Sequence, residues 1–551
     1  MNEHPHTITE LLARSGGALW LSGDSAADID GTRVGEYVPT SLAHDSRRVT
    51  PGSLFFAVPG FAADGHDYVS AAADAGAVAA VVEHPVAGVT LPQFGVADVR
   101  RALAYAAAAW YGDPSHAFAL TGVTGTNGKT TTCYLLDAIL RAAGRETGLI
   151  GTVETRVAGV AHPSERTTPD ALALQELFAQ MRDSNVGACV MEVSSHALDL
   201  HRVDASRFAV AAFTNLTQDH LDYHSDMDAY RSAKESLFTA QEVAARVVCV
   251  DTDEGRALAQ RLTAAGHEVI TAGTGTARET PPSSASGSVG LGTCHSGGTQ
   301  CNPESIVNDD GTCGRPQDGE NGIQIIAAGV HRHARGSDFT LVTPEGTVPV
   351  TLPLLGAYNV SNAVTAAACA WAQGIAPDTI ARGLNAAPQV PGRLEQIEGG
   401  RDFQVVVDYA HTPDALRVAL SALRAVTPGR VIVVCGCGGD RDRTKRPLMG
   451  RAAGQGADVV YATSDNPRSE NPASIIDEML PGLAQTDAEY HVVVERDAAI
   501  RAAITGARAG DCVLIAGKGH EDYQIFADRT IHFDDREQAR AALLDGIAGE
   551  L

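Results

Sequence analysis

The last 160 or so residues alternate short apolar runs with amphipathic segments. This alternation predicts strands at Gln404–Asp408, Arg430–Cys435, Ala457–Thr463, His491–Glu495 and Asp511–Ala516, with a helix at Pro413–Ala425 among the segments between them. Strands that alternate with helices at this spacing favour a parallel sheet covered on both faces. We therefore expect a Rossmann-like α/β domain over residues 391–551.

Two further regions differ from it in texture. Residues 1–115 mix short apolar runs such as Ser53–Val58 and Ala77–Val82 with turns, and end in an Ala-rich helix at about Asp98–Trp110. A strand-like run, His116–Val123, opens the region 116–390. The pattern thus predicts an α/β protein of three domains: a smaller N-terminal α/β domain, a central domain with a mostly parallel sheet, and the C-terminal domain.

A stretch of about residues 273–322 has no hydrophobic periodicity and is rich in Gly, Ser, Thr and Pro, which predicts a surface insertion in the central domain. Cys294, Cys301 and Cys313 lie within it, but they form no close Cys-x-x-Cys pair. A bland loop is therefore favoured over a zinc site.

Charge and composition limit the partners. The 551 residues carry a formal net charge of −25, which disfavours nucleic acid because a phosphate backbone needs a basic surface. No apolar run is long enough to span a membrane, and the first residues do not resemble a secretory signal. Several cysteines lie in strand-like runs (Cys189, Cys249, Cys512), which is typical of a reduced, cytoplasmic protein.

The strongest local motif is Gly122-Val-Thr-Gly-Thr-Asn-Gly-Lys-Thr-Thr131, between a predicted strand at Ala117–Val123 and a predicted helix at Lys129–Ala143. Strand, glycine-rich loop and helix N-terminus together direct backbone N–H groups at a polyphosphate. Lys129 would reach the β- and γ-phosphates, and Thr130 would offer its hydroxyl to Mg²⁺. The usual phosphate loop has glycine where Val123 stands, so an ordinary glycine-rich turn is the alternative.

The spelling Gly-Thr-Asn-Gly-Lys-Thr resembles the loop of the Mur ligase and folylpolyglutamate synthetase superfamily, whose members use ATP to join a carboxylate to an amine. The resemblance implies an ATP site that is completed from the last domain, which would close on the central one. Its residues would be Thr124, Gly125, Thr126, Asn127, Gly128, Lys129, Thr130, Thr131, Asn359, Asn362, Arg393 and Asp408, with His411 as a further candidate. From spacing alone, Asn359 and Asn362 share one helix face, and simple capping would also explain them.

Glu192 ends the predicted strand Ala188–Val193, so its carboxylate faces the crevice at the carboxyl end of a parallel sheet. With Thr130 it could hold Mg²⁺, although a surface ion pair is the plainer interpretation. By resemblance, His220 binds a second Mg²⁺ and Lys234 carries a CO₂-derived carbamate (N6-carboxylysine) that also ligates this ion. Together with Lys129 and Glu192, they would form the catalytic group. Periodicity alone predicts that Lys234 is an exposed helix lysine.

Three C-terminal motifs, at 436–447, 465–470 and 516–524, resemble those of the Mur ligases that add a diamino acid. The resemblance assigns the diamino acid to Arg441, Asp465, Asn466, Pro467, Arg468, Gly517 and Glu521. A guanidinium at Arg468 pairs bidentately with the second carboxylate of meso-diaminopimelate, which lysine lacks. Glu521 can receive the distal ammonium. These features favour meso-diaminopimelate over lysine.

The resemblance assigns the UDP-sugar dipeptide to Ser46, Thr167, Thr168, Ser194 and Arg202. Phe61 and Ala62 depart from the polar residues that the family's uridine loop often carries.

The implied activity is the ATP-dependent addition of meso-diaminopimelate to the D-glutamyl residue of UDP-N-acetylmuramoyl-L-alanyl-D-glutamate, by way of an acyl phosphate, in peptidoglycan biosynthesis. The alternatives are the same ligase acting on L-lysine, and a P-loop switch protein without ligase activity. A nucleic-acid motor fits poorly with the net charge.

Overall fold

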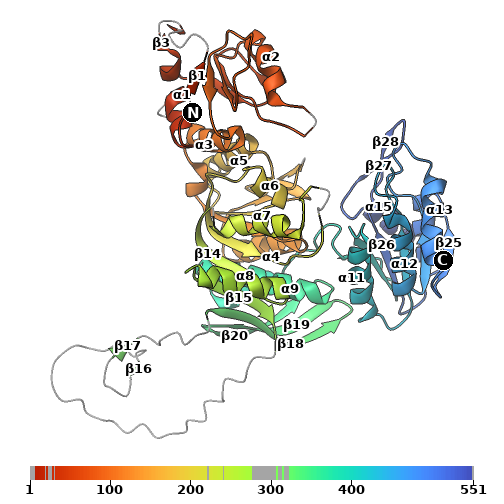
Figure 1. The fold of residues 1–551 in the computed structure, drawn as a ribbon. Coiled ribbons are helices and arrows are strands. Elements are labelled where there is room, and N and C mark those ends of the chain that lie inside the picture. The colour runs from red at the N-terminus through yellow and green to blue at the C-terminus, as the bar shows by residue number, and fades with distance from the viewer. Residues whose placement is uncertain are drawn as a thin grey trace, which may run out of the picture.

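The computed structural model describes residues 6–18, 20–22, 28–29, 32–61, 63–164, 166–219, 223–239, 241–275, 306–307, 313–314 and 322–548 (Figure 1). His220, Ala62 and most of the predicted insertion, including Cys294 and Cys301, lie outside these ranges. The described chain builds three main sheets in succession, and helices pack against each of them. This confirms the predicted α/β fold class.

The N-terminal sheet has five strands in the order β1-β7-β6-β5-β4, and all neighbours are parallel except β1 with β7. Its apolar core gathers side chains from the sheet and from the helices α1 and α3. The elements are α1 (Ile8–Ala13), β1 (Trp20–Ser22), β4 (Ser41–Ala43), β5 (Ser53–Phe56), α2 (Val69–Asp74), β6 (Ala79–Val82), β7 (Gln93–Gly95) and α3 (Val99–Trp110), with a separate pair β2 (Asp28–Ile29) and β3 (Thr32–Arg33).

The central sheet has eleven strands in the order β11-β10-β9-β12-β8-β13-β14-β15-β18-β19-β20. Its middle, from β9 to β18, is parallel, and antiparallel strands extend it at both ends. The strands are β8 (Ala119–Thr124), β9 (Thr147–Ile150), β10 (Glu154–Val157), β11 (Val160–Pro163), β12 (Ala188–Glu192), β13 (Arg207–Phe213), β14 (Glu242–Cys249), β15 (Val269–Thr274), β18 (Gln324–His333), β19 (Gly336–Thr343) and β20 (Gly346–Leu352). The predicted insertion therefore falls between β15 and β18, which are neighbours in the sheet. A short described pair, β16 (Ile306–Val307) and β17 (Cys313–Gly314), lies within it.

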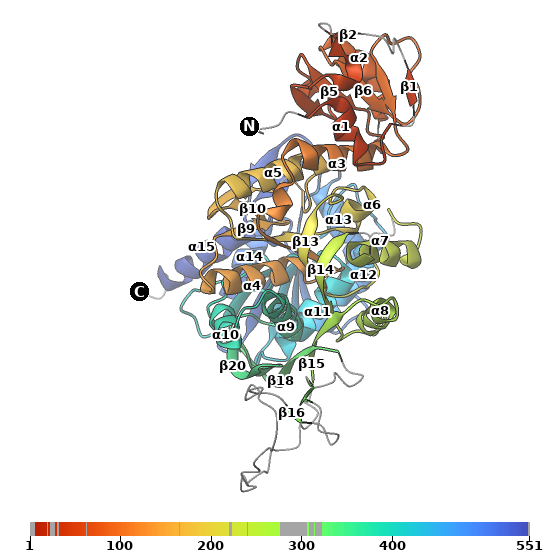
Figure 2. The ribbon, with the colours of Figure 1, turned by 90° about the vertical axis from the view of Figure 1, so that its left-hand side faces the viewer.

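Helices cover both faces of the central sheet. One apolar core holds α4 (Lys129–Ala142), α9 (Ala357–Ala372) and α10 (Pro377–Asn385), which lie together in Figure 2. The other holds α5 (Ala171–Asp183), α6 (Ser195–Asp199), α7 (Met227–Thr239) and α8 (Asp253–Ala264). This sandwich buries the parallel strands on both sides and leaves their carboxyl ends to carry polar loops.

The C-terminal sheet has the order β21-β22-β26-β23-β24-β25, in which five strands are parallel and β21 is antiparallel. Helices α11, α12 and α13 pack on one face, and α14 and α15 on the other. The elements are β21 (Glu395–Gln396), β22 (Gln404–Asp408), α11 (Pro413–Arg424), β23 (Val431–Cys435), α12 (Lys445–Gly456), β24 (Val459–Ala462), α13 (Pro472–Leu483), β25 (Glu489–Val492), α14 (Arg496–Thr505), β26 (Cys512–Ala516), β27 (Tyr523–Ile525), β28 (Thr530–His532) and α15 (Asp535–Ala548).

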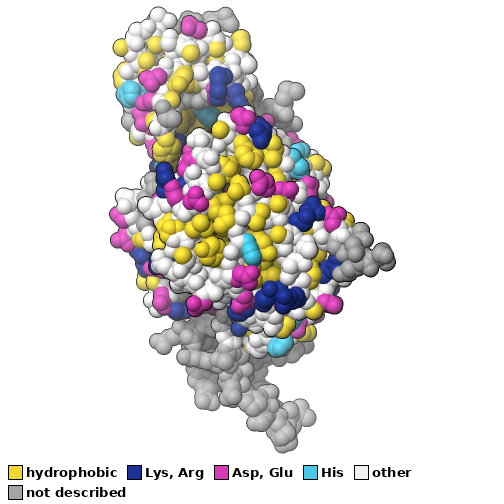
Figure 3. All heavy atoms as spheres, turned by 90° about the vertical axis from the view of Figure 1, so that its right-hand side faces the viewer, with side chains coloured by type: hydrophobic (Ala, Val, Ile, Leu, Met, Phe, Trp, Pro, Cys, Tyr) yellow, Lys and Arg dark blue, Asp and Glu magenta, His cyan; other side chains and the backbone are white. Residues whose placement is uncertain are grey.

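The predicted parallel sheet is thus confirmed, although the strand expected at His491–Glu495 lies slightly earlier, at Glu489–Val492. On the face of the molecule formed largely by the C-terminal domain, Lys and Arg side chains lie among acidic and apolar ones and form no extended basic surface (Figure 3). Within the described residues, no helix combines the length and the apolar character that a membrane crossing needs.

Candidate functional site

The phosphate-loop motif joins β8 to α4, as predicted. Two of its glycines need positive φ angles, 146° at Gly125 and 86° at Gly128, and a Cβ at Gly128 would collide with the side-chain oxygen of Asn362. Residues after the neighbouring strand β13 brace the loop, because the Thr126 N–H donates to the carbonyl oxygen of Asn215 at 2.8 Å. The Lys129 ammonium donates to the carbonyl oxygens of Gly125 and Thr126, and burial lowers its pKa.

Glu192 ends β12, the strand next to β8, and it is buried. Its Oε1 accepts hydrogen bonds from the Thr130 hydroxyl at 3.0 Å and from the Thr152 N–H at 2.7 Å. The Thr152 hydroxyl donates to Oε2 at 3.2 Å. A buried carboxylate beside a P-loop hydroxyl is the kind of oxygen donor set that fits Mg²⁺. The alternative of a surface ion pair is wrong.

Lys234, on α7, is 2% exposed, so the periodicity-based prediction of an exposed lysine is wrong. Its Nζ donates to the carbonyl oxygen of Gly125 at 2.7 Å and lies 4.6 Å from the ring centroid of Tyr230. Burial, followed by the nearby Lys129 charge, holds the Lys234 pKa well below its ordinary value. The buried site therefore disfavours the charged form of Lys234.

Asn359 and Asn362 share one buried face of α9, as their spacing predicts. The Asn362 side-chain amide donates to Oδ1 of Asn359 at 2.9 Å, and that of Asn359 donates to the carbonyl oxygen of Leu355 at 2.7 Å. Neither side chain caps the helix, whose N-cap, Gly356, has no side-chain hydrogen bond. Instead, Asn362 lies directly against the P-loop at Gly128.

The residues expected to bind the dipeptide adjoin Glu192. The Thr168 hydroxyl donates to the carbonyl oxygen of Glu192 at 2.8 Å and accepts from the Ser194 N–H at 3.1 Å. The Arg202 guanidinium donates to the carbonyl oxygen of Thr168 at 2.8 Å, and the hydroxyls of Thr167 and Thr152 are 3.0 Å apart. These contacts make one polar network with the P-loop.

Two more arginines add positive charge to this network. Burial lowers the pKa of Arg202, and the nearby charges of Arg166 and Arg100 lower it further. Ser46 lies apart, in the turn Ser46–Arg48 of the N-terminal domain. The same segment touches the central domain, where His44 Nε2 is 3.4 Å from Oδ1 of Asp170. The basic cluster suits an anionic ligand that runs between these two domains.

In the C-terminal domain, the residues expected to bind the diamino acid follow three adjacent strands. Arg441 follows β23, Asp465–Arg468 follow β24, and Gly517–Glu521 follow β26. Arg441 is exposed, whereas Asp465 and Asn466 are buried. The Arg468 guanidinium donates to the carbonyl oxygen of Gly439 at 2.8 Å, and a Cβ at Gly438 would lie between the side chains of Arg468 and Arg441. The two arginines therefore both lie close to Gly438 at this edge.

Asp408 ends β22, the fourth strand of this edge. Arg393 lies in the turn that packs on the end of this strand. The Asp408 carboxylate accepts hydrogen bonds from the backbone N–H groups of Leu394 and Ala410. Burial raises the pKa of Asp408, and the positive charge of Arg393 partly opposes this rise. The positive charge of Arg393 also contributes to the lowered pKa of Lys129, whose main cause is burial. His411 is exposed, and its Nδ1 is 2.8 Å from the carbonyl oxygen of Tyr409.

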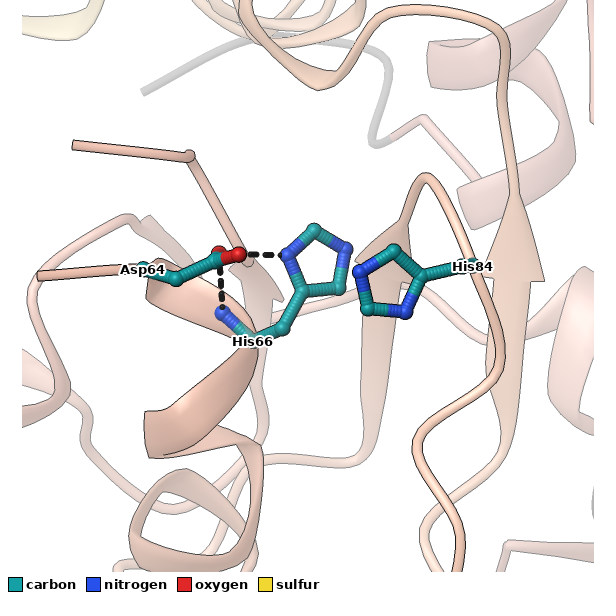
Figure 4. A group of neighbouring side chains, drawn as sticks. All are labelled: Asp64, His66 and His84. Carbon is teal, nitrogen blue, oxygen red and sulfur yellow. Dashed lines mark hydrogen bonds and ion pairs between the residues drawn. The ribbon is translucent and has the colours of Figure 1, made fainter.

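Asp64, His66 and His84 form a group that resembles a metal site in the N-terminal domain (Figure 4). His66 is buried and stacks on His84 with 4.0 Å between ring centroids. Its Nε2 accepts the Glu83 N–H at 2.9 Å, so the ring proton lies on Nδ1, which donates to Asp64 at 2.7 Å. Both ring nitrogens are occupied, and we interpret the group as a structural brace.

Sequence reasoning missed three members of these sites. Thr152 follows β9 and binds Glu192. Tyr409 contacts both the Arg393 guanidinium and the His520 ring. Lys518 is fully buried beside Glu521. Lys518 stands inside the motif at 516–524, and Tyr409 directly follows the predicted residue Asp408. Their place next to predicted residues was the available signal, whereas Thr152 had none.

Comparison with known proteins gives a consistent picture. Three family descriptions match: "Mur ligase family, catalytic domain" at residues 40–111, "Mur ligase middle domain" at 123–288, and "Mur ligase, glutamate ligase domain" at 392–519. A UDP-N-acetylmuramoyl-L-alanyl-D-glutamate–2,6-diaminopimelate ligase of Geobacillus thermodenitrificans is 43% identical over 509 residues, which cover 91% of this chain and 94% of the relative. The protein of the same name from Gloeobacter violaceus is 42% identical, covering 97% of this chain and 98% of the relative.

Solved structures agree. A structure with the same ligase name covers 98% of this chain and 99% of its own, with a TM-score of 0.65 and 27% identity. A MurF ligase from Thermotoga maritima in complex with ADP shares the fold, with a TM-score of 0.57 and 18% identity, covering 93% of this chain and 98% of its own. Because relatives above 40% identity match nearly its whole length, the chain belongs to the Mur ligase family.

Proposed function

We propose that this protein is an ATP-dependent ligase that adds meso-diaminopimelate to the D-glutamyl residue of UDP-N-acetylmuramoyl-L-alanyl-D-glutamate in peptidoglycan biosynthesis. One observation carries the proposal: Glu192 joins the P-loop, through Thr130, to the polar network of Thr168. A phosphoryl donor and a carboxylate acceptor bound on the two sides of Glu192 would meet there. The names of the most similar relatives support the substrate choice.

In the first step, the D-glutamyl γ-carboxylate attacks the γ-phosphate of ATP and gives an acyl phosphate and ADP. The glycine-rich loop presents its N–H groups to the phosphates, and Lys129 turns from the loop carbonyls to the transferred group. Arg202, Thr168 and Ser194 hold the dipeptide so that its carboxylate stays in line with the phosphorus. Thr124–Thr131, Asn359, Asn362, Arg393 and Asp408 hold the nucleotide.

In the second step, the amine of the diamino acid attacks the acyl carbon, and inorganic phosphate leaves. Asp465–Arg468, Arg441, Gly517 and Glu521 present this amine from the C-terminal domain. Arg468 selects the second carboxylate, because an unpaired guanidinium would penalise lysine in its place. The C-terminal domain excludes water from the acyl phosphate when it closes on the central one.

Mg²⁺, held by Thr130 and Glu192, with His220 and a carbamate on Lys234 at a second position, would stabilise negative charge on the phosphoryl oxygens. The oxygen donors around Glu192 and the lowered pKa of Lys234 both fit this assignment. ATP and UDP-linked substrates belong to the cytoplasm, where we expect the enzyme to act.

The test follows phosphate release and product mass with ATP, Mg²⁺, the UDP-sugar dipeptide and an equimolar mixture of meso-diaminopimelate and L-lysine. We expect release only when both the dipeptide and a diamino acid are present, and a product heavier by a diaminopimelyl residue. Release that needs neither would indicate a nucleotide switch, and equal incorporation of lysine would refute the selectivity.

A further inference from the structure

Lysine is scarce in this chain, because only four of its 42 Lys and Arg residues are lysines. Lys129 and Lys234 belong to the nucleotide site described above, and Lys445 is exposed at the start of α12. Lys518 is the remaining one, and its side chain is 0% exposed. Burial of an ammonium is costly unless it is paired, so the contacts of Lys518 indicate what it does there.

Lys518 contacts two residues of the diamino-acid edge. Its Nζ donates to Oδ1 of Asn466 at 3.2 Å and to Oε2 of Glu521 at 3.3 Å. The Asn466 amide in turn donates to the same Oε2 at 3.1 Å, and its Oδ1 also accepts the Ile525 N–H at 3.0 Å. The ring centroid of Tyr523 lies 5.3 Å from the Lys518 ammonium. These contacts leave Asn466 and Glu521 little rotational freedom.

The two carboxylate oxygens of Glu521 differ in their hydrogen bonds. Oε2 receives both internal donors, whereas Oε1 has no partner among the described residues, and the side chain is 18% exposed. The exposed oxygen is therefore left for an incoming cation. Without Lys518, the carboxylate would lose its internal counter-charge and could turn Oε1 towards the Asn466 amide.

We propose that Lys518 is a positioning residue for amino-acid recognition, which fixes Glu521 and Asn466 so that Glu521 receives the distal ammonium of the substrate. The inference rests on the proposed ligase function. It adds a buried cation to the residues that determine which amine is accepted. Lys518 does not touch substrate, so its effect must appear through Glu521.

The experiment measures phosphate release by the full-length enzyme with Lys518→Met, while each substrate is varied in turn. We expect the KM for meso-diaminopimelate to rise tenfold or more, while the KM values for ATP and the UDP-sugar dipeptide stay within twofold of wild type. Lys445→Met, which removes an exposed lysine of the same domain, is the matched control. A parallel loss for all three substrates would indicate a merely structural role and overturn the proposal.

Two comparisons isolate the distal ammonium. The KM for 2-aminopimelate, which lacks the distal amine, should differ less than threefold between wild type and Lys518→Met. In a Glu521→Gln background, Lys518→Met should add less than twofold to the KM for diaminopimelate, because its route of action is already removed. Additive effects of the two substitutions would contradict the proposal.

If Lys518→Met does not fold, as judged by the absence of a cooperative thermal transition, Lys518→Gln takes its place. Lys518→Gln is neutral but keeps a donor, and an unchanged KM for diaminopimelate in this variant would refute the role of the charge. Failure of the ligase assignment looks different, because wild-type phosphate release would then not depend on the diamino acid.

Discussion

The guanidinium of Arg393 lies over the ring of Tyr409, with 4.8 Å between its central carbon and the ring centroid. The Tyr409 ring also neighbours two histidines, His411 at 4.6 Å and His520 at 5.2 Å between ring centroids, and His520 lies on the loop that carries Glu521. Residues expected to bind ATP and residues expected to bind the diamino acid are thus stacked within one domain. A closing movement of this domain would bring both groups to the central P-loop together.

Replacement of Tyr409 tests this stacking. We expect Tyr409→Leu to raise the KM for ATP by about 2- to 30-fold, because a cation–π contact contributes roughly 0.5–2 kcal/mol. Tyr409→Phe keeps the ring and should stay within twofold of wild type. Steady-state phosphate release with varied ATP measures both, and equal effects of the two variants would argue against stacking.

Glu192→Gln should strongly reduce turnover while it preserves the local fold. The amide oxygen can still accept the Thr152 N–H, but the negative charge beside Thr130 is lost. We expect phosphate release to fall at least 100-fold and the remaining activity to need more Mg²⁺. Glu154→Gln, on β10 and separated from Glu192 by the strand β9, is the control. A wild-type Mg²⁺ titration for Glu192→Gln would exclude a metal role.

The buried Lys234 predicts a specific pH dependence of stability. Its pKa is lowered in the folded state from an ordinary value of 10.5, so the unfolded chain binds the proton more tightly. The cost to the folded state is full below the lowered pKa and disappears as pH rises towards 10.5. In CO₂-free buffer, the unfolding free energy of wild type should therefore rise more steeply with alkaline pH than that of Lys234→Met. Parallel curves would contradict the lowered pKa.

Lys234→Ala should also lose activity, and short carboxylates such as formate should restore part of it by replacing the proposed carbamate. Phosphate release with and without added carboxylate measures this rescue. Full activity of the unsupplemented variant would refute a carbamate at Lys234.

Arg468→Lys tests selectivity without a change of backbone strain, because both residues face the same cost at the positive φ of 51°. Loss of the bidentate pair should raise the KM for meso-diaminopimelate by about 5- to 150-fold, which corresponds to roughly 1–3 kcal/mol. The rate with L-lysine should change much less. Arg451→Lys, on α12, is the control, and competition assays between the two diamino acids provide the measurement.

Arg496 lies beneath the edge that carries the residues expected to bind the diamino acid, and we expect its loss to lower the unfolding free energy strongly. Its fully buried guanidinium pairs with Asp535 at 2.7 Å and donates to the carbonyl oxygens of Ser464 and Ala516, which precede the two diamino-acid loops. Arg496→Met should cost about 3–5 kcal/mol of unfolding free energy, because Asp535 is left buried and unpaired. Urea titration should show partial recovery in Arg496→Met with Asp535→Leu, and no recovery would mean that the carbonyl contacts dominate.

Much of the fold follows from local pattern. The P-loop helix, Glu192 at the end of its strand and the parallel C-terminal sheet were all predictable, because apolar periodicity and glycine-rich turns encode them over a few residues. Thr152 was not, because its partner Glu192 is 40 residues away and only the adjacency of β9 and β12 brings them together.

Lys234 shows how periodicity fails. Its helix has an apolar face and a charged face, so a lysine in the pattern is assigned to solvent. The P-loop backbone covers this position in the folded chain, and Gly125 accepts the ammonium. Helical periodicity describes the packing of a helix on its sheet, and it does not record loops from another element that cover the remaining side.

The scarcity of lysine affects how the protein responds to alkali. Most proteins lose positive charge near pH 10, because surface ammonium groups of lysine release their protons there. Guanidinium groups stay protonated beyond pH 12. Here the described surface carries its positive charge on arginine, with Lys445 as its exposed lysine. Ion-exchange retention and electrophoretic mobility should therefore change little between about pH 8 and 10, and amine-reactive labels will have few attachment points.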